Sequence, residues 1–127
     1  MGGTRYADIN VRVIAASNRD LEDACRKGEF REDLFYRLNV IPIMLPPLRE
    51  REGDVEVLAQ EFLKRFRGRG SERAGDEPSF DPAALACLKA HAWPGNVREL
   101  QNVIERVAAL ADGPTIRVDH LPERIRA

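Results

Sequence analysis

The sequence lacks the features that mark membrane, secreted and disulfide-stabilised proteins. Its longest apolar stretch, residues 40–48, contains three prolines and is far too short to cross a bilayer. No apolar segment of the kind found in secretion signals follows the opening residues 2–5. Two cysteines, Cys25 and Cys87, are too few for a disulfide framework, and we expect them to be small buried side chains. These absences predict a cytoplasmic protein with no membrane partner.

The sequence also lacks an excess of charge of either sign. Lys and Arg total 20 and Asp and Glu total 21, which gives a net charge of -1. A protein dedicated to coating nucleic acid would be basic overall, so this balance argues against that class. At 127 residues, with 43% hydrophobic and 32% charged side chains, the chain has room for one domain or two small subdomains.

The groups that bind a triphosphate and its metal ion are missing as well. A P-loop needs a lysine between glycine and Ser or Thr, and none of Lys27, Lys64 and Lys89 stands in that context. The single Asp-Glu pair, residues 76–77, does not follow an apolar strand, as a pair of catalytic carboxylates that hold magnesium would. By itself, the chain is therefore not expected to bind a nucleoside triphosphate tightly.

No recognisable metal motif is present either. Cys87 and His91 are four residues apart, a spacing that can place two ligands on one helix face, and Cys25 or His120 could complete such a set. Neither a Cys-x-x-Cys nor a His-Glu-x-x-His pattern supports this arrangement, so we expect no metal site.

The first third of the chain predicts two strands and two short helices. Residues 11–16 are β-branched and almost continuously apolar, as in a buried strand, and residues 40–45 predict a second strand that Pro42 favours at an edge. Between them, Asp20 is a suitable N-cap for a helix that Gly28 ends, and residues 31–38 predict another helix.

The remainder predicts a helical bundle. After a polar linker over residues 48–53, apolar spacing predicts a helix that Asp54 caps. Residues 67–79 are expected to be a mobile connection. Asp81-Pro82 starts the next helix, which Leu85 and Leu88 anchor. A turn at Pro94-Gly95 precedes a third helix, for which Asn96 and Glu99 form a capping box. A short extended piece is expected at residues 116–118. The helix before it carries a regular apolar seam, formed by Val97, Leu100, Ile104, Val107 and Ala111.

Four motifs, in a fixed order, resemble one protein family. They are Ala-Ser-Asn-Arg-Asp-Leu at residues 16–21, Phe-Arg-Glu-Asp-Leu-Phe-Tyr-Arg-Leu-Asn-Val at 30–40, Leu-Pro-Pro-Leu-Arg-Glu-Arg at 45–51 and Trp-Pro-Gly-Asn-Val-Arg-Glu-Leu at 93–100. The sequence is similar to the AAA+ ATPase domain of bacterial enhancer-binding proteins, which activate sigma-54 RNA polymerase, and it corresponds to the C-terminal half of that domain. Ser17 stands where Thr is commoner in the family, and it keeps the hydroxyl group.

The resemblance implies an α/β fold: the last two strands and short helices of an AAA+ subdomain over residues 1–53, then an all-helical lid over residues 54–127. The expected function is that of a longer parent, a transcriptional activator of the two-component type. That parent hydrolyses ATP with Mg²⁺ in a hexameric or heptameric ring and remodels the sigma-54 holoenzyme. Its DNA contacts are made through a domain outside this chain, and the chain alone is expected to show no ATPase activity.

The resemblance also assigns roles to three residues of the first subdomain. Asn18 matches sensor I, a carboxamide that orients water or reports the γ-phosphate; alternatively, it hydrogen-bonds its own backbone to start a turn. Arg31 and Arg37 match the candidate arginine fingers, which enter the nucleotide site of a neighbouring subunit. The alternatives are that Arg31 pairs with Glu29 or another neighbour and that Arg37 pairs with Asp33 on the helix surface.

In the lid, Arg98 matches sensor II, an arginine that contacts nucleotide phosphates. It lies in the first turn of its helix, away from the apolar seam, and its alternatives are a contact with Asn102 or simple solvation. Trp93 is expected to anchor the core of the lid. The basic run over residues 65–73 is expected to be a solvated linker, although it could touch nucleic acid.

Two other functional classes remain open. The chain could be a non-enzymatic helical module that binds a protein partner, in which case Arg31, Arg37 and Arg98 would be dispensable for that binding. It could also be a helical DNA-binding domain, because residues 96–110 follow a tight turn like a recognition helix, but the net charge disfavours this.

Overall fold

The computed structural model describes residues 3–68 and 77–126. Contacts divide the chain into an N-terminal unit, residues 1–44, and a helical unit, residues 45–127. The helical unit includes Leu48, which packs in its core. No helix in the described part of the chain is both long and apolar enough to span a membrane.

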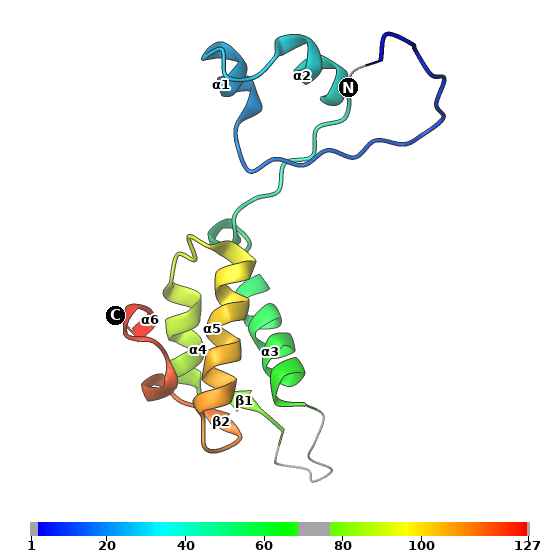
Figure 1. The fold of residues 1–127 in the computed structure, drawn as a ribbon. Coiled ribbons are helices and arrows are strands. Elements are labelled where there is room, and N and C mark those ends of the chain that lie inside the picture. Colours follow the sequence, from blue (N-terminus) through cyan, green and yellow to red (C-terminus); the bar gives the residue numbers. More distant parts are fainter. Residues whose placement is uncertain (1–2, 69–76, 127) are drawn as a thin grey trace. The chain divides into compact units, whose positions relative to one another are not determined.

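The N-terminal unit contains the two helices that its sequence predicts (Figure 1). The first, α1, spans Leu21–Arg26, and the backbone N–H of Asp23 donates to Asp20 Oδ1 at 3.1 Å, which confirms the expected N-cap. Gly28, with φ of 74°, follows the helix in the left-handed conformation that glycine adopts without strain. The second, α2, spans Glu32–Leu38.

The two predicted strands of this unit are not formed. Residues 11–16 and 40–45 have no strand pairing within the described chain, and their apolar side chains are largely exposed, for example Ile14 at 83% and Ile41 at 81%. A strand exists only when a neighbour takes up its backbone N–H and C=O groups. The expected pair of strands was therefore wrong as a description of this chain, because the apolar pattern does not itself supply a neighbour.

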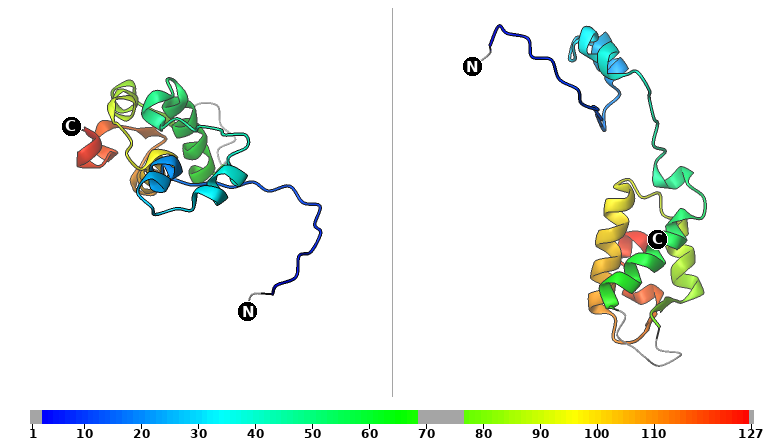
Figure 2. Two further views of the ribbon diagram at one scale, coloured as in Figure 1. Left: turned by 90° about the horizontal axis from the view of Figure 1, so that it is seen from above. Right: turned by 90° about the vertical axis from the view of Figure 1, so that its right-hand side faces the viewer.

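The helical unit is built from three longer helices that lie side by side, with shorter elements at their ends (Figures 1 and 2). The α-helices are α3 (Asp54–Arg67), α4 (Pro82–Ala90), α5 (Asn96–Leu110) and α6 (Glu123–Arg126). Two 3-10 turns, η1 (Leu48–Glu50) and η2 (Val118–His120), complete the helical elements.

A short parallel ladder closes the end of the bundle where α4 begins and α5 finishes. Strand β1 (Ser79–Phe80) pairs with β2 (Thr115–Ile116), in the register Ser79 to Thr115 and Phe80 to Ile116. The extended piece expected at residues 116–118 therefore begins earlier and ends at Ile116, since Val118 opens η2.

The core of the helical unit follows the apolar spacing of its helices. Trp93 is fully buried, and its indole Nε1–H donates to the carbonyl oxygen of Leu88 at 2.7 Å, which confirms the expected core anchor. Leu48 is also buried, so the segment predicted as a polar linker contributes to the core instead. The other residues of the core lie on α3, α4, α5 and the C-terminal segment: Val55, Ala59, Phe62, Leu63, Ala84, Leu88, Leu100, Val103, Ile104, Val107, Ile116, Leu121 and Ile125.

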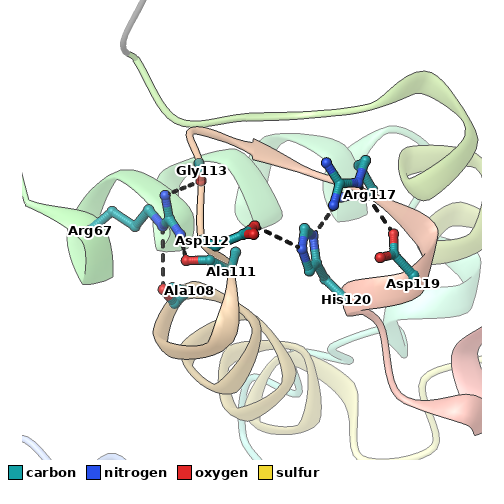
Figure 3. Close-up of polar contacts among 8 residues, drawn as sticks. All are labelled: Arg67, Ala108, Ala111, Asp112, Gly113, Arg117, Asp119 and His120. Carbon is teal, nitrogen blue, oxygen red and sulfur yellow. Dashed lines mark hydrogen bonds and ion pairs between the residues drawn. The ribbon is translucent and has the colours of Figure 1, made fainter.

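Arg67 fastens the end of α3 to the end of α5 (Figure 3). Its guanidinium donates to the carbonyl oxygens of Ala108, at 3.3 Å, of Ala111, at 2.5 Å, and of Gly113. These carbonyl groups lie where a helix leaves its last acceptors without partners, so one side chain satisfies several of them. The prediction that Arg67 belongs to a mobile connection was wrong; most of that connection, with Arg69 and Arg73, lies outside the described residues.

A second polar contact orders the chain after β2 (Figure 3). The backbone N–H of Arg117 donates to His120 Nδ1 at 2.9 Å, and His120 Nε2 lies 3.6 Å from Asp112 Oδ1. His120 therefore holds η2 against the end of α5.

Candidate functional site

The turn between α4 and α5 has an unusual backbone. Trp93, with φ of 53°, and Asn96, with φ of 52°, both occupy the left-handed region, and the N–H of Asn96 donates to the carbonyl oxygen of Trp93 at 2.8 Å. Gly95 lies so close to the following helix that an added Cβ would be 2.6 Å from Glu99 Cβ. Burial of the indole and crowding at Gly95 therefore fix the direction in which α5 starts.

The expected capping box of Asn96 and Glu99 is not formed. Glu99 Oε1 accepts a hydrogen bond at 2.9 Å from the backbone N–H of Gly95, the residue before Asn96, and the N–H of Asn96 donates to the carbonyl oxygen of Trp93 instead. Asn96, however, does not cap the helix: its Oδ1 accepts from the backbone N–H of Leu48 at 2.9 Å. The carboxamide is used for a contact between segments far apart in sequence, which no local pattern could have indicated.

Arg98 lies in the first turn of α5 and is exposed. Leu100, Val103 and Ile104 occupy the packed face of the same helix. Within residues 3–68 and 77–126, the Arg98 side chain makes no hydrogen bond or ion pair, and the alternative contact with Asn102 is not formed. The guanidinium of Arg98 is thus presented to solvent from the first turn of α5, where it can meet a phosphate or carboxylate.

Beside Arg98, Glu99 is the centre of a polar cluster that the sequence did not reveal. Its Oε2 lies 3.2 Å from His91 Nε2 and 3.7 Å from Arg124 Nε, and the carboxylate is 15% exposed. Burial opposes ionisation of Glu99, but the hydrogen bonds from Gly95 and His91 and the charges of His91 and Arg124 outweigh it, so its pKa is lowered. The cluster secures the turn from which Arg98 projects.

His91 faces Glu99, and its ring also stacks edge-on against Trp93 at 4.7 Å between ring centroids. No group of three or more His, Cys, Asp and Glu side chains is placed to hold a metal ion within the described residues. The cysteine and histidine at positions 87 and 91 therefore do not come together with further ligands there.

In the N-terminal unit, Arg31 stands at the start of α2. Its Nη2 lies 2.6 Å from Asp33 Oδ2, and its Nε lies 3.1 Å from Asp33 Oδ1, so the two side chains form a bidentate pair. This hydrogen bond and charge raise the pKa of Arg31 and lower that of Asp33. The pair is 78% and 62% exposed, so breaking it to reach another ligand costs little.

Arg37 occupies the last turn of α2 and is exposed. The expected alternative, an ion pair with Asp33, is not formed, because Asp33 engages Arg31. In the part of the chain that the structure describes, the guanidinium of Arg37 has no ion pair and is exposed.

Asn18 precedes α1 in an exposed turn. The hydroxyl of Ser17, rather than Asn18, stabilises this turn by accepting from the N–H of Arg19 at 3.0 Å. Arg19 in turn pairs with Glu29, which joins the turn to the segment before α2. Asn18, Arg31 and Arg37 do not hydrogen-bond one another in the described structure; each is presented separately.

Comparison with protein families gives two matches that follow the two units. The model of the AAA+ ATPase lid domain matches residues 49–127, and that of the sigma-54 interaction domain matches residues 1–44.

Individual relatives cover nearly the whole chain. Regulatory protein AtoC of Escherichia coli K12 is 49% identical over 126 residues, which are 99% of this chain and 27% of AtoC. A Nif-specific regulatory protein of Rhizobium leguminosarum bv. trifolii is 52% identical over 116 residues, 91% of this chain and 32% of the relative. The chain thus spans about a third or less of the length of these curated relatives.

Solved structures agree with the sequence relatives. The crystal structure of NtrX from Brucella abortus in complex with ADP matches with a TM-score of 0.80 and 40% identity, over 98% of this chain and 29% of that one. The ATP complex of the same protein matches with a TM-score of 0.80 and 39% identity, over 97% of this chain and 28% of that one.

Proposed function

The chain belongs to the AAA+ ATPase lid domain family, with a sigma-54 interaction segment ahead of the lid, and we propose that it forms the C-terminal part of the ATPase domain of a sigma-54-dependent transcriptional activator. The observation that carries this proposal is the order of the two family matches along one chain, together with 49% identity to AtoC over 99% of the chain described here.

In this proposal, the complete protein hydrolyses ATP with Mg²⁺ and uses the energy to remodel the sigma-54 RNA polymerase holoenzyme in the bacterial cytoplasm. The P-loop and the metal-binding carboxylates come from a part of the protein beyond this chain, as do the sigma-54 contact loop and any DNA-binding domain. The complexes of NtrX with ADP and ATP support a nucleotide site in such a protein.

The chain supplies four polar side chains to that site. Arg98, held at the start of α5 and exposed, contacts the nucleotide phosphates as sensor II. Asn18 orients the attacking water or reports the γ-phosphate. Arg31 and Arg37 reach the nucleotide of a neighbouring subunit in a hexameric or heptameric ring, where a guanidinium stabilises the charge that develops during phosphoryl transfer.

The decisive test uses a longer protein that carries this segment together with a P-loop. We expect Arg31→Ala and Arg37→Ala each to lower ATP turnover by roughly 10³-fold or more, the scale of arginine fingers. Arg26→Ala is the matched control, since Arg26 is exposed on α1 and its one ion pair within residues 3–68 and 77–126 is with Asp23 at 3.7 Å. Turnover unchanged by both finger substitutions would contradict the proposal.

Mixing subunits tests the action in trans. Subunits with Arg31→Ala or Arg37→Ala retain an intact P-loop, and subunits with a defective P-loop retain intact arginines. If the arginines act across an interface, a mixture recovers part of the turnover that neither variant has alone. No recovery, with assembly of the mixed ring verified by native mass spectrometry, would place the arginines in their own subunit's site.

This chain by itself provides a third test. Calorimetric titration with ADP, or with a non-hydrolysable ATP analogue and Mg²⁺, should show no saturable binding, since the sequence has no P-loop. Saturable binding would mean that the helical unit and its arginines form a nucleotide site without one.

A non-enzymatic interaction module is the second candidate. The observation that favours it is the self-contained core of the helical unit, which includes Trp93, Leu63 and Ile104. In that case, Arg31→Ala, Arg37→Ala and Arg98→Ala would leave partner binding unchanged, whereas the ATPase function predicts loss of turnover with the helical unit still folded.

A further inference from the structure

Residues 45–48, the segment by which the chain enters the helical unit, are hydrogen-bonded to α5, the helix that carries Arg98. Pro46 and Pro47 have no N–H group, so Leu48 carries the first backbone donor after them. Leu48 is 2% exposed, and its N–H donates to Asn96 Oδ1 at 2.9 Å. A buried N–H without a partner would be costly, and the Asn96 carboxamide removes that cost.

The position of Asn96 requires an unusual residue. Its φ of 52° lies in the left-handed region, which asparagine, aspartate and glycine tolerate better than other residues. Its side chain must also offer an acceptor oxygen to Leu48. Asparagine and aspartate meet both conditions, whereas glycine meets only the first. This difference provides a matched pair of substitutions.

We propose that Asn96 is a positioning residue for Arg98, which it couples to the segment where the chain enters the helical unit. This inference rests on the proposed contact of Arg98 with nucleotide phosphates. Arg98 lies two residues after Asn96 in the same helical turn, and η1 packs against α5. A displacement of residues 45–48 is therefore transmitted through the Leu48–Asn96 hydrogen bond to the turn that carries Arg98. The binding of nucleotide at Arg98 in turn restrains the entry segment.

The geometric part can be tested on this chain by amide hydrogen exchange measured with NMR. Asn96→Gly removes the acceptor without straining the backbone, and we expect exchange of the Leu48 amide to accelerate roughly 2- to 10-fold, the effect of one lost hydrogen bond. Asn96→Asp keeps an acceptor oxygen and should leave that amide protected. Equal protection of the Leu48 amide in both variants would overturn the inference.

The functional part needs the longer protein with its P-loop. We expect Asn96→Gly to weaken ADP binding roughly 2- to 10-fold, with Asn96→Asp close to the original protein. If Asn96 acts through Arg98, adding Asn96→Gly to Arg98→Ala has no further effect on ADP affinity. The unfolding midpoint of each variant shows whether the effect merely follows a loss of stability.

The outcomes separate the two proposals. Independent, additive losses from Asn96→Gly and Arg98→Ala overturn the coupling but leave the proposed role of Arg98 intact. Unchanged ADP affinity in Arg98→Ala contradicts the proposed role of Arg98 and removes the basis of the coupling with it. Loss from Asn96→Gly, its rescue by Asn96→Asp and its absence in the Arg98→Ala background together support the inference.

Discussion

The two units of this chain have similarly apolar stretches, but only one of them buries its apolar side chains. In the helical unit, Leu63, Trp93 and Ile104 have no exposed surface. In the N-terminal unit, Ile14 and Met44 are 83% and 88% exposed, and Ala24 is the one hydrophobic residue among the buried residues of its described part. The difference shows that apolar content alone does not decide whether a segment forms a core.

The two units differ in where their elements find partners for the backbone N–H and C=O groups. A helix satisfies its own backbone groups, so α3, α4 and α5 need only pack their apolar faces together. An isolated strand satisfies none of its backbone groups and must pair with another. Residues 11–16 and 40–45 are separated by two short helices, and neither segment pairs with another strand in the described chain.

Removal of the buried indole should have the largest effect on the stability difference between the two units. We expect Trp93→Ala to lower the free energy of unfolding of the helical unit by about 3–5 kcal/mol, because it leaves a cavity and an unpaired carbonyl at Leu88. Urea denaturation followed by circular dichroism measures the change. Val57→Ala, at a position 63% exposed on α3, should change stability by less than about 0.5 kcal/mol. Equal effects of the two substitutions would refute the importance of the core.

A smaller effect is expected from Arg67, which fastens two helix ends. Arg67→Lys keeps the positive charge but loses the planar fork that reaches the carbonyl groups of Ala108, Ala111 and Gly113. We expect a loss of about 1.5–3 kcal/mol in the free energy of unfolding. Urea titration of both proteins at neutral pH measures it. If lysine fully replaces arginine, charge rather than hydrogen-bond geometry stabilises the junction.

The Glu99 cluster should make the stability of the helical unit depend on pH. Because folding lowers the pKa of Glu99 below its usual 4.5, its contribution to stability is present above that value and is lost as pH falls through the lower folded pKa. We expect Glu99→Gln to lower stability at pH 7 by on the order of 1 kcal/mol. The difference from the original protein should shrink below pH 4.5. A difference that does not change with pH would show that ionisation of Glu99 is unimportant.

The smallest effect should come from deleting the N-terminal unit. Among the residues that the structure describes, the core of the helical unit is drawn entirely from positions 48–125. The free energy of unfolding of residues 45–127 alone should therefore match that of the helical unit in the full chain within about 0.5 kcal/mol. Circular dichroism and tryptophan fluorescence of Trp93 report this transition. A clear loss of stability would show that the first 44 residues contribute to the fold of the second unit.

The sequence predicted best those elements whose physical causes are local. The cap at Asp20, the proline at the start of α4 and the spacing from Leu100 to Val107 each depend on neighbours a few residues away, and each is present in the structure. The strand at residues 11–16 depends on a distant partner, which periodicity cannot report. Leu48 was misjudged for a related reason: its short segment is polar, and a helix distant in sequence buries it.

The candidate site shows the same limit. Arg98 could be placed on the free face of α5 from the helical period alone, and the structure presents it there. The roles of Asn18, Arg31, Arg37 and Arg98 remain predictions from the family resemblance. Three contacts could not be predicted, because each joins segments far apart in sequence or crosses a turn of unknown geometry: Asn96 with Leu48, Glu99 with His91, and Arg67 with the end of α5.

The turn from Trp93 to Asn96 has a consequence for how such a domain can be altered by recombination or design. Three different features restrict the residue type at each position of this turn. The space in the core requires Trp93, the proximity of Glu99 requires Gly95, and the left-handed backbone and the hydrogen bond to Leu48 require Asn96. Each residue is thus acceptable only while the others, and the distant Leu48, are in place. A chimera that exchanges α5 without its preceding turn and entry segment would combine incompatible parts. These segments have to be transferred together, as one inherited block.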